Sequence, residues 1–264
     1  MRSNSREIEA ALIIWSENPR ADARQIAALT SIADYQLLPQ DSQTIHDLYF
    51  DTPDRTLQTQ KLALRVREID ATRWLTLKGH SQLTDWGGVE RLEIEVLWSE
   101  DALTKIVKQL RDRGIKTLQL RQDLDYTHPL DVMSSLGLGL VQDRESHRRA
   151  RDIVRADAEI GPVLAELAID SVVYHFGDQG IHLHEVEIEA KAGGGSTVVK
   201  TVIESLVAIY GLALRRWDHS KLVTGMAIER LLSEGALEGL LDINNTLKPA
   251  AYDRIDDYLK CGSI

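Results

Sequence analysis

The sequence predicts an α+β fold whose strands form a closed sheet covered by helices. Five short stretches carry charges at every second position, with apolar residues between them and charges of both signs. Because alternate side chains of a strand point to opposite faces, each stretch has one ionic and one apolar face. A sheet that only faced solvent would not need such regular charges, whereas a closed sheet gathers carboxylates, guanidiniums and ammoniums around one cavity. The stretches are 7–9, 65–67, 75–78, 93–95 and 185–191.

Eight runs follow the two-residue period of a strand, and many of them are separated by short turns. Eight strands are enough to close an antiparallel barrel, and the expected architecture is therefore a closed eight-stranded β-barrel, or tunnel. The runs cover residues 6–15, 44–50, 61–69, 72–79, 89–98, 140–156, 164–175 and 181–191.

Helical patterns lie between and after these strands and would cover the apolar outer face of the sheet. Ser99 is expected to cap one helix, and Gly211 to end another. Gly193-Gly194-Gly195 breaks the last long strand, after which Ser196 or Thr197 caps the next helix. The expected helices cover residues 21–30, 99–113, 129–136, 196–210 and 219–233.

The last part of the chain reads as two short helical pieces joined by a turn over residues 242–246. Pro249 fits the first turn of the second piece. We therefore expect a domain of residues 1–233 and a helical C-terminal appendage of residues 234–264. The appendage carries no candidate chemistry, but it is a candidate for a homodimer contact.

Composition fits an ordinary globular protein, because 43% of the 264 residues are hydrophobic. The longest apolar runs, such as 136–141, are far shorter than a membrane span, and no apolar signal region follows the N-terminus. The single cysteine, Cys261, excludes an intramolecular disulfide and a cysteine-built zinc site. We therefore expect a cytoplasmic protein with no membrane partner.

The charge of the chain limits its partners. The formal net charge is −10 at pH 7, which disfavours nucleic acid, because proteins that bind its backbone usually present a basic surface. An acidic exterior around a basic lumen is still compatible with an anionic ligand. Such a ligand must be small enough to enter the lumen.

Two arginines stand on one face of a predicted strand. Arg65 and Arg67 are two residues apart, which places their guanidiniums about 7 Å apart along the strand. Two guanidiniums at this spacing can bind neighbouring phosphoryl groups. Lys78, at the end of the next strand, adds a third cation. The alternative is a solvent-facing strand whose charges discourage aggregation.

Three glutamates form the sharpest local pattern. Glu185, Glu187 and Glu189 share one strand face, where their like charges repel unless metal or cations lie opposite. Glu7 and Glu9 repeat the arrangement near the other end of the chain. If the first and last strands meet, these carboxylates could bind one or two magnesium or manganese ions. The alternative is two solvated strand faces.

Other familiar motifs are weak or missing. His182 and His184 have a ligand spacing on a strand, but no cysteine or third histidine lies nearby in the sequence, so we expect surface histidines. The sequence contains no Gly-rich phosphate loop and no G-x-S-x-G motif, and Gly137-Leu138-Gly139 is a poor dinucleotide fingerprint.

The order of the charged stretches resembles the CYTH family of triphosphate tunnel metalloenzymes, over about residues 6–233. No single motif is very specific, but seven of them occur in the family order. They are Tyr49-Phe50-Asp51-Thr52-Pro53, Leu62-Ala63-Leu64-Arg65-Val66-Arg67, Trp74-Leu75-Thr76-Leu77-Lys78-Gly79, Arg91-Leu92-Glu93-Ile94-Glu95, Glu166-Leu167-Ala168-Ile169-Asp170, Glu185-Val186-Glu187-Ile188-Glu189-Ala190-Lys191 and Ser220-Lys221.

The resemblance implies an antiparallel tunnel of eight strands that binds a triphosphate through lumen Arg and Lys side chains and a divalent metal through Glu. Members include inorganic triphosphatases, thiamine triphosphatases and class IV adenylyl cyclases. Carried over by position, the substrate-binding residues would be Arg65, Arg67, Lys78, Arg144, Arg148, Lys191 and Lys221. The run 144–151 leaves open which of Arg144, Arg148, Arg149 and Arg151 face the lumen.

The same resemblance implies roles for the acidic residues. Glu7, Glu9, Glu185, Glu187 and Glu189 would bind Mg²⁺ or Mn²⁺ or orient a water, and the catalytic residues would be Glu187, Glu189 and Lys78. A further acidic layer would consist of Glu93, Glu95, Glu166 and Asp170.

One position departs from the family pattern. The family's first strand reads Glu-x-Glu-x-Lys, whereas this chain has Ala11 at the place of the lysine. We therefore expect a metal-dependent hydrolase of a small triphosphate, such as tripolyphosphate or an organic triphosphate. The alternatives are a class IV adenylyl cyclase that makes cyclic AMP from ATP, and a tunnel that binds polyphosphate or nucleotide without turnover.

Overall fold

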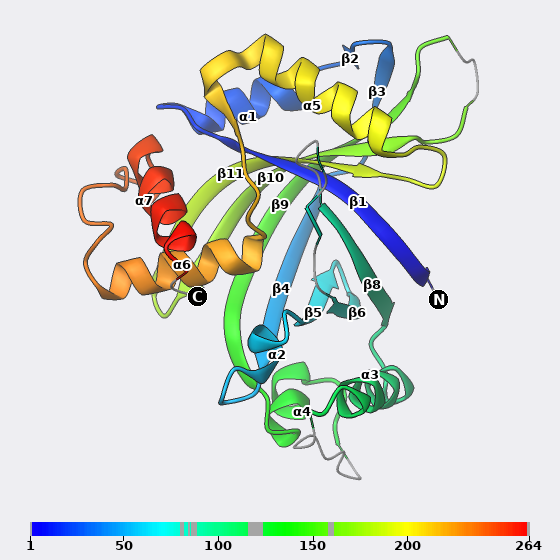
Figure 1. Cartoon of the computed structure of the whole chain (residues 1–264), viewed down its shortest axis with the longest axis vertical. Coiled ribbons are helices and arrows are strands. Elements are labelled where there is room, and N and C mark those ends of the chain that lie inside the picture. Colours follow the sequence, from blue (N-terminus) through cyan, green and yellow to red (C-terminus); the bar gives the residue numbers. More distant parts are fainter. Residues whose placement is uncertain are drawn as a thin grey trace. The chain divides into compact units, whose positions relative to one another are not determined.

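The computed structural model describes residues 2–79, 82–83, 85, 89–115, 124–157 and 161–262, without the side chains of residues 2–7, 82–83 and 89–92. Its contacts divide the chain into two compact units. Unit 1 comprises Met1–Arg6, Ile45–Gln82 and Arg91–Arg144. Unit 2 comprises Glu7–Thr44, Leu83–Glu90 and Glu145–Ile264. Both units combine strands with helices, which confirms the predicted α+β class (Figure 1).

Unit 1 is built on antiparallel strands in the order β8-β6-β5-β4, and β9 follows β4 in the sheet. Strand β5 lies between β4 and β6, where Arg67 pairs with Asp47 on one side and with Trp74 on the other. The strands are β4 (Gln43–Asp51), β5 (Ala63–Ile69), β6 (Thr72–Lys78), β7 (Gln82–Leu83), β8 (Val89–Leu97) and the start of β9 (Gly139–Arg155). The helices are α2 (Thr56–Thr59), α3 (Glu100–Asp112) and α4 (Pro129–Ser135).

The hydrophobic core of unit 1 lies on one face of these strands. Alternation places Leu64 and Val66 of β5 on this face, where they share a buried cluster with Leu103 of α3 and Met133 of α4. The Ser99 hydroxyl accepts a hydrogen bond from Ala102 N at 3.2 Å, which confirms the expected helix cap. The opposite face of the same strands is therefore left for polar side chains.

Unit 2 contains the first and the last long strands, which pair with each other as expected. Antiparallel pairing places Glu9 of β1 opposite Glu189 of β11, and β11 pairs on its other side with β10. The strands are β1 (Arg2–Ile14), β2 (Ser31–Ile32), β3 (Tyr35–Pro39), the end of β9, β10 (Ala165–Phe176), β11 (Gln179–Ala190) and β12 (Leu214–Arg216). The helices are α1 (Pro19–Ala27), α5 (Ser196–Tyr210), the 3-10 turn η1 (Gly211–Ala213), α6 (Lys221–Ser233) and α7 (Pro249–Lys260).

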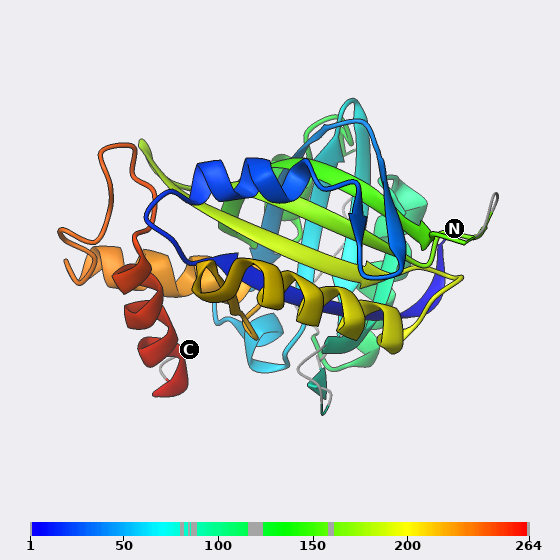
Figure 2. The ribbon, with the colours of Figure 1, turned by 90° about the horizontal axis from the view of Figure 1, so that it is seen from above.

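Helices α1 and α5 cover one face of the unit 2 strands (Figure 2). Val186 and Ile188 of β11 point to this side and are fully buried against Ile26 of α1 and Val202 of α5. Alternation sends Glu185, Glu187 and Glu189 to the other face. Helices cover the apolar face of β11. Its carboxylates therefore lie on the opposite face, which we call the interior face of unit 2.

Helix α5 and the turn after it are the most membrane-like part of the described chain. Residues Ser196–Ala213 are the one described stretch that is helical, long and apolar enough to cross a membrane, by length and composition, with a mean hydropathy of 1.4. Lys200 and Glu204 lie within this stretch, so its uninterrupted apolar runs are shorter than a span, as the sequence predicts. Val199 and Leu206 are fully buried in the core, which accounts for the apolar character of this helix.

The C-terminal segment differs from its prediction in one element. Residues 234–240 form turns rather than a first helical piece, whereas α7 is the expected second piece, with Pro249 in its first turn. The Asp242 carboxylate accepts hydrogen bonds from the backbone N–H groups of Asn244 and Thr246, which confirms the connecting turn. The division into residues 1–233 and 234–264 stays a proposal. Short β2, β3, β7 and β12 and the single turn α2 were not expected.

Candidate functional site

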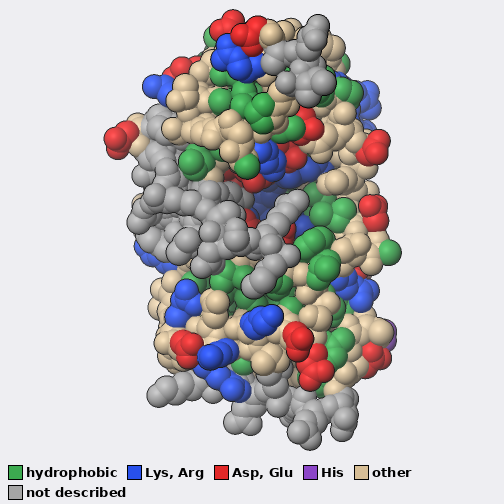
Figure 3. Space-filling view, turned by 90° about the vertical axis from the view of Figure 1, so that its right-hand side faces the viewer, with side chains coloured by type: hydrophobic (Ala, Val, Ile, Leu, Met, Phe, Trp, Pro, Cys, Tyr) green, Lys and Arg blue, Asp and Glu red, His purple; other side chains and the backbone are tan. Residues whose placement is uncertain are grey.

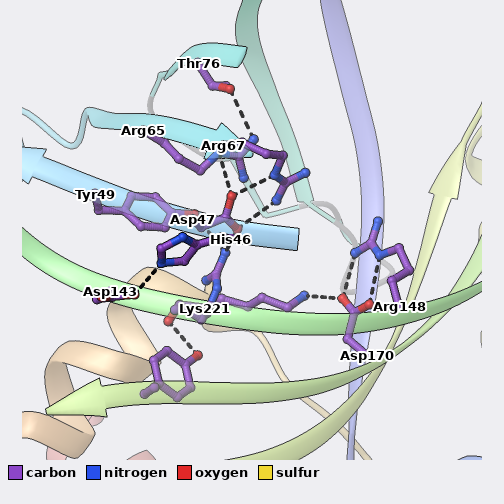
Figure 4. A network of polar contacts seen from close by, with 12 residues as sticks. His46, Asp47, Tyr49, Arg65, Arg67, Thr76, Asp143, Arg148, Asp170 and Lys221 are labelled. Carbon is purple, nitrogen blue, oxygen red and sulfur yellow. Dashed lines mark hydrogen bonds and ion pairs between the residues drawn. The ribbon is translucent and has the colours of Figure 1, made fainter. Parts of the chain in front are cut away.

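A cluster of cations with one central carboxylate lies on the polar face of the unit 1 strands (Figure 4). We call it the basic cluster. Its strands present charged and aromatic groups at alternate positions, because their other positions fill the hydrophobic core. It consists of Asp47 and Tyr49 on β4, Arg65 and Arg67 on β5, Thr76 and Lys78 on β6, Glu93 and Glu95 on β8, and Arg144 on β9.

Asp47 is the centre of the basic cluster. Its side chain is 1% exposed, and Arg67 donates two hydrogen bonds to it, from Nε to Oδ1 at 2.7 Å and from Nη2 to Oδ2 at 2.9 Å. Arg144 donates a further hydrogen bond from Nη2 to Oδ2. Burial alone would raise the pKa of Asp47, but the charges of Arg67, Arg65 and Arg144 hold it well below its usual value. Asp47 is therefore ionised and fixes the positions of these arginines.

Arg65 is held more loosely than Arg67. Its Nε lies 3.5 Å from Asp47 Oδ1 and, within the described part of the chain, makes no hydrogen bond although it is buried. Its Nη2 lies 3.7 Å from Glu93 and 3.6 Å from Glu95 and donates to Thr76 Oγ1 at 3.2 Å. Lys78 Nζ lies 3.3 Å from Glu93 Oε1. These longer contacts leave capacity for another anion.

Tyr49 is a residue that the sequence reasoning did not assign to the site. Two guanidiniums lie over its ring, with Arg144 5.2 Å and Arg65 5.9 Å from the ring centre, and its hydroxyl accepts a hydrogen bond from Arg144 at 3.2 Å. Burial would raise the pKa of Tyr49, but these arginine charges lower it to about 8. Asp47 was missed as well. The signal available in the sequence was that Asp47 and Tyr49, like Ile45 and Asp51, stand at every second position of one strand and therefore share a face.

A second cluster, which we call the acidic cluster, lies on the interior face of unit 2. The strand register sets carboxylates side by side: Glu189 lies between Glu9 and Glu166, and Glu185 lies beside Asp170. The cross-strand partners of Glu187 are small, Ala11 on β1 and Ala168 on β10. The cluster comprises Glu9, Glu166, Asp170, Glu185, Glu187, Glu189 and the cations Arg148, Lys191 and Lys221.

Two cations lie among the most buried carboxylates. Arg148 donates to both oxygens of Asp170, at 2.8 and 2.7 Å, and to Glu187 Oε2 at 2.8 Å. Lys221, the first residue of α6, places its Nζ 3.2 Å from Asp170 and 2.6 Å from Glu187 and also forms an ion pair with Glu185. These contacts bridge strands β9, β10 and β11 to α6.

The carboxylates of the acidic cluster are crowded enough to hold a metal ion. Asp170, Glu185 and Glu187 each offer an oxygen within 4.8 Å of the others. Burial raises the pKa of Glu185 to about 7, against the charge of Lys221, with Glu187 and Asp170 adding repulsion. Carboxylate oxygens are the hard ligands that Mg²⁺ and Mn²⁺ prefer, so the donor set fits such an ion provided that the ion takes over contacts that Lys221 now makes with the same three carboxylates.

The remaining carboxylates extend the cluster along the strands. Lys191 Nζ lies 3.1 Å from Glu189 Oε2 and 3.7 Å from Glu166 Oε2. Glu9 faces Glu189 across the β1–β11 pair. Glu7 also lies in β1, but its side chain is outside the described part of the chain. We expected Arg148, Lys191 and Lys221 among the substrate-binding cations. In the structure, each of them forms ion pairs with carboxylates of the acidic cluster.

The register of the arginine run, open in the sequence, is defined by the structure. Gln142, Arg144, Ser146 and Arg148 fall on one face of β9, with the first three buried. Arg151 belongs to the other face, where it donates to the backbone carbonyls of Ala27 and Leu37. Arg149 shares that alternate face, so Arg144 and Arg148 are the two members directed into the clusters.

The expectation of surface histidines is wrong for His184. Its side chain is 7% exposed, and its Nδ1 lies 3.0 Å from Ser171 Oγ. Burial, and then the charge of Arg20, lower its pKa to about 4. Alternation predicts which face a histidine takes but not that α1 covers that face.

The family model of the CYTH domain matches residues 18–216 of this chain. The match includes the whole basic cluster and most of the acidic cluster. It leaves out Glu9 at one end and Lys221 at the other. No curated protein matches the chain.

Solved structures from several organisms align with this chain. A protein from Hippeastrum, HpAC1, named as an adenylyl cyclase and described as having a dominant triphosphatase activity, is 19% identical, with a TM-score of 0.51 over 85% of this chain and 95% of that chain. A protein from Bacillus halodurans named as an adenylate cyclase is 18% identical, with a TM-score of 0.46 over 82% and 95%. The triphosphatase of the Mimivirus capping enzyme is 11% identical, with a TM-score of 0.34 over 79% and 89%. The first likeness supports the fold alone.

Proposed function

Because this chain belongs to the CYTH domain family, we propose that it hydrolyses the terminal phosphoryl group of a small triphosphate, either tripolyphosphate or an organic triphosphate. The basic cluster is the observation that carries this proposal. Buried guanidiniums that are already held in place match phosphoryl oxygens and lose little freedom on binding. The closed eight-stranded tunnel and a cytoplasmic location remain parts of the proposal.

The distances suggest which contacts of the basic cluster would change when a triphosphate binds. Asp47 holds Arg67 by two short hydrogen bonds and would keep it in place. Glu93 contacts Arg65 and Lys78 only at 3.3–3.7 Å, with a side chain that is 15% exposed. Phosphoryl oxygens would therefore replace Glu93 at Arg65 and Lys78, which strengthens both contacts without displacing the central carboxylate.

The acidic cluster would bind the metal through Asp170, Glu185 and Glu187, with Glu9 and Glu189 on the neighbouring positions. A magnesium or manganese ion bound there would supply the positive charge that phosphoryl transfer needs and would help to orient a water. Among the chain's own residues, Glu187 and Glu189 would accept hydrogen bonds from that water, and Lys78 would stabilise charge on the phosphoryl oxygens.

Ala11 favours one alternative, a tunnel that binds without turnover. The register places Ala11 opposite Glu187, two residues from Glu9 on the same face of β1. The lysine of the family pattern is thus missing from the face where it would lie. A triphosphate would then be held by the basic cluster without the full charge stabilisation of its transition state.

A product assay tests the proposal. The purified protein is given tripolyphosphate, thiamine triphosphate or ATP, with magnesium, with manganese or with a chelator. A triphosphatase releases phosphate only when metal is present. Cyclic AMP with pyrophosphate from ATP would show a cyclase instead, and tight binding without any product would show a binding protein.

A further inference from the structure

Helix α7 contacts the segment that carries Lys221, although its sequence showed no candidate chemistry. Asp256 of α7 is 7% exposed. Its Oδ2 accepts a hydrogen bond from Arg215 Nη2 at 2.9 Å, and its Oδ1 lies 3.1 Å from His219 Nε2. The two contacts come from β12 and from the loop before α6, so one carboxylate fixes both ends of the segment that leads to Lys221.

The same segment is held on its other sides. The backbone N–H of Trp217 donates to Ala11 O of β1 at 3.1 Å, and its ring packs edge-on against Tyr252 of α7, with 6.0 Å between the ring centres. The hydroxyl of Tyr174 on β10 donates to the backbone carbonyl of Lys221 at 2.8 Å. The backbone at Lys221 is therefore located by β1, β10 and α7 together.

This location matters because of where the Lys221 ammonium lies. It reaches Asp170, Glu185 and Glu187, three carboxylates whose mutual repulsion requires a cation at a fixed place. A lysine side chain has many rotamers, so a small shift of its backbone would release the ammonium from this position.

From these contacts we infer that Asp256 is a positioning residue that holds Lys221 in the acidic cluster, and that α7 is thereby part of the site. The expected consequence, a change in the affinity for a triphosphate with metal, rests on the proposed function. The position of Lys221 does not depend on that function.

Lysine labelling of the full chain tests the position directly. Mild acetic anhydride is applied without ligand, and acetylation of Lys221 is measured by peptide mass spectrometry against the half-exposed Lys200. In Asp256→Asn we expect Lys221 to react about tenfold faster than in the wild type, the change expected when a hydrogen-bonded charge is removed. Asp253→Asn is the matched control, because Asp253 also binds Arg215 but does not contact His219. It should leave the labelling of Lys221 unchanged.

A double-mutant cycle tests the consequence for binding. Asp256→Asn should weaken tripolyphosphate affinity in the presence of manganese, but it should have no further effect when Lys221 is already methionine. Additive losses would mean that Asp256 acts by another route and would overturn the inference. If Asp256→Asn does not fold by circular dichroism, His219→Ala removes one of the contacts that Asp256 makes with the segment before Lys221, and it is labelled in the same way.

The positioning role of Asp256 and the proposed function can fail separately. Unchanged Lys221 labelling in folded Asp256→Asn and His219→Ala would overturn the positioning role, whatever the activity. Faster labelling in a protein that binds no triphosphate would support the positioning role and contradict the proposed function.

Discussion

The basic cluster of unit 1 and the acidic cluster of unit 2 contain the same kinds of charged side chain in opposite proportion, with more cations in the first and more carboxylates in the second. In the basic cluster, Asp47 is surrounded by three guanidiniums, which hold its pKa well below the usual value. In the acidic cluster, Lys221 is surrounded by three carboxylates, and the pKa of Glu185 is raised to about 7 by burial and by its neighbours. The excess charge at each site indicates what it would receive: an anion at the first and a metal ion at the second.

The clusters also differ in which structural elements position the central residue of opposite charge, Asp47 in the basic cluster and Lys221 in the acidic cluster. Asp47 lies in the middle of a strand and is positioned by the sheet itself. Lys221 lies at the first residue of α6 and depends on contacts from β10 and α7. We therefore expect the basic cluster to be rigid and the acidic cluster to depend on the C-terminal helices. On the face shown in Figure 3, described acidic and basic side chains are interspersed.

The largest expected effect is loss of the central carboxylate of the basic cluster. Asp47→Ala leaves three guanidiniums near one another without their shared partner, which should lower the free energy of unfolding by about 3–5 kcal/mol. Urea denaturation measures this. Asp143→Ala is the control, because Asp143 forms its ion pair with the half-exposed His46, and its loss should cost at most about 1 kcal/mol. Equal losses in the two variants would contradict the central role of Asp47.

A smaller effect is expected from a carboxylate of the acidic cluster. Glu187→Gln keeps the size of the side chain but removes one of three candidate metal ligands, so manganese affinity should fall at least about tenfold. Calorimetry with manganese measures the change. Glu204→Gln on the exposed side of α5 is the control. A metal titration that Glu187→Gln leaves unchanged would place the metal elsewhere.

Ala11→Lys sharpens the contrast by adding a cation to the acidic cluster. A lysine at this position would lie beside Glu187 and could contact the phosphate chain more strongly in the transition state. A gain of about 1.4 kcal/mol would raise turnover about tenfold. Phosphate release from tripolyphosphate under saturating metal is the readout, with Ala11→Met as a control of similar length. Equal rates in the lysine and methionine variants would favour the binding-only alternative.

The basic cluster also predicts a pH dependence. The folded pKa of Tyr49, about 8, lies below the unfolded value, so Tyr49 contributes stability that increases as pH rises from about 8 towards the unfolded pKa near 10. The tyrosinate should at the same time repel a triphosphate, so affinity should fall above pH 8. Absorbance at about 295 nm should show one tyrosine ionising near pH 8 that is missing in Tyr49→Phe but retained in Tyr35→Phe. A single step near pH 10 for all tyrosines would refute this assignment.

The sequence predicted the long strands and the charged faces well, because both depend on local alternation. Arg65 with Arg67, and Glu185 with Glu187, share faces as expected. The two clusters themselves were less visible. Alternation gives the strand face of Asp47, but the pairing of β4 with β5 is needed to place Asp47 beside Arg67. The Arg215–Asp256 contact joins residues 41 positions apart, which no local pattern can indicate.

Calorimetry of tripolyphosphate binding in the presence of a chelator separates the two clusters when it is applied to the wild type, Arg67→Ala and Glu187→Gln. We expect the wild type and Glu187→Gln to bind equally without metal. Arg67→Ala should bind more weakly by about 1.5–3 kcal/mol, because it loses a charge-assisted contact to phosphate. Arg73→Ala, whose guanidinium pairs with Glu68 instead, is the control and should bind normally. Unchanged affinity in Arg67→Ala, or a loss confined to Glu187→Gln, would contradict the assignment of the anion to the basic cluster.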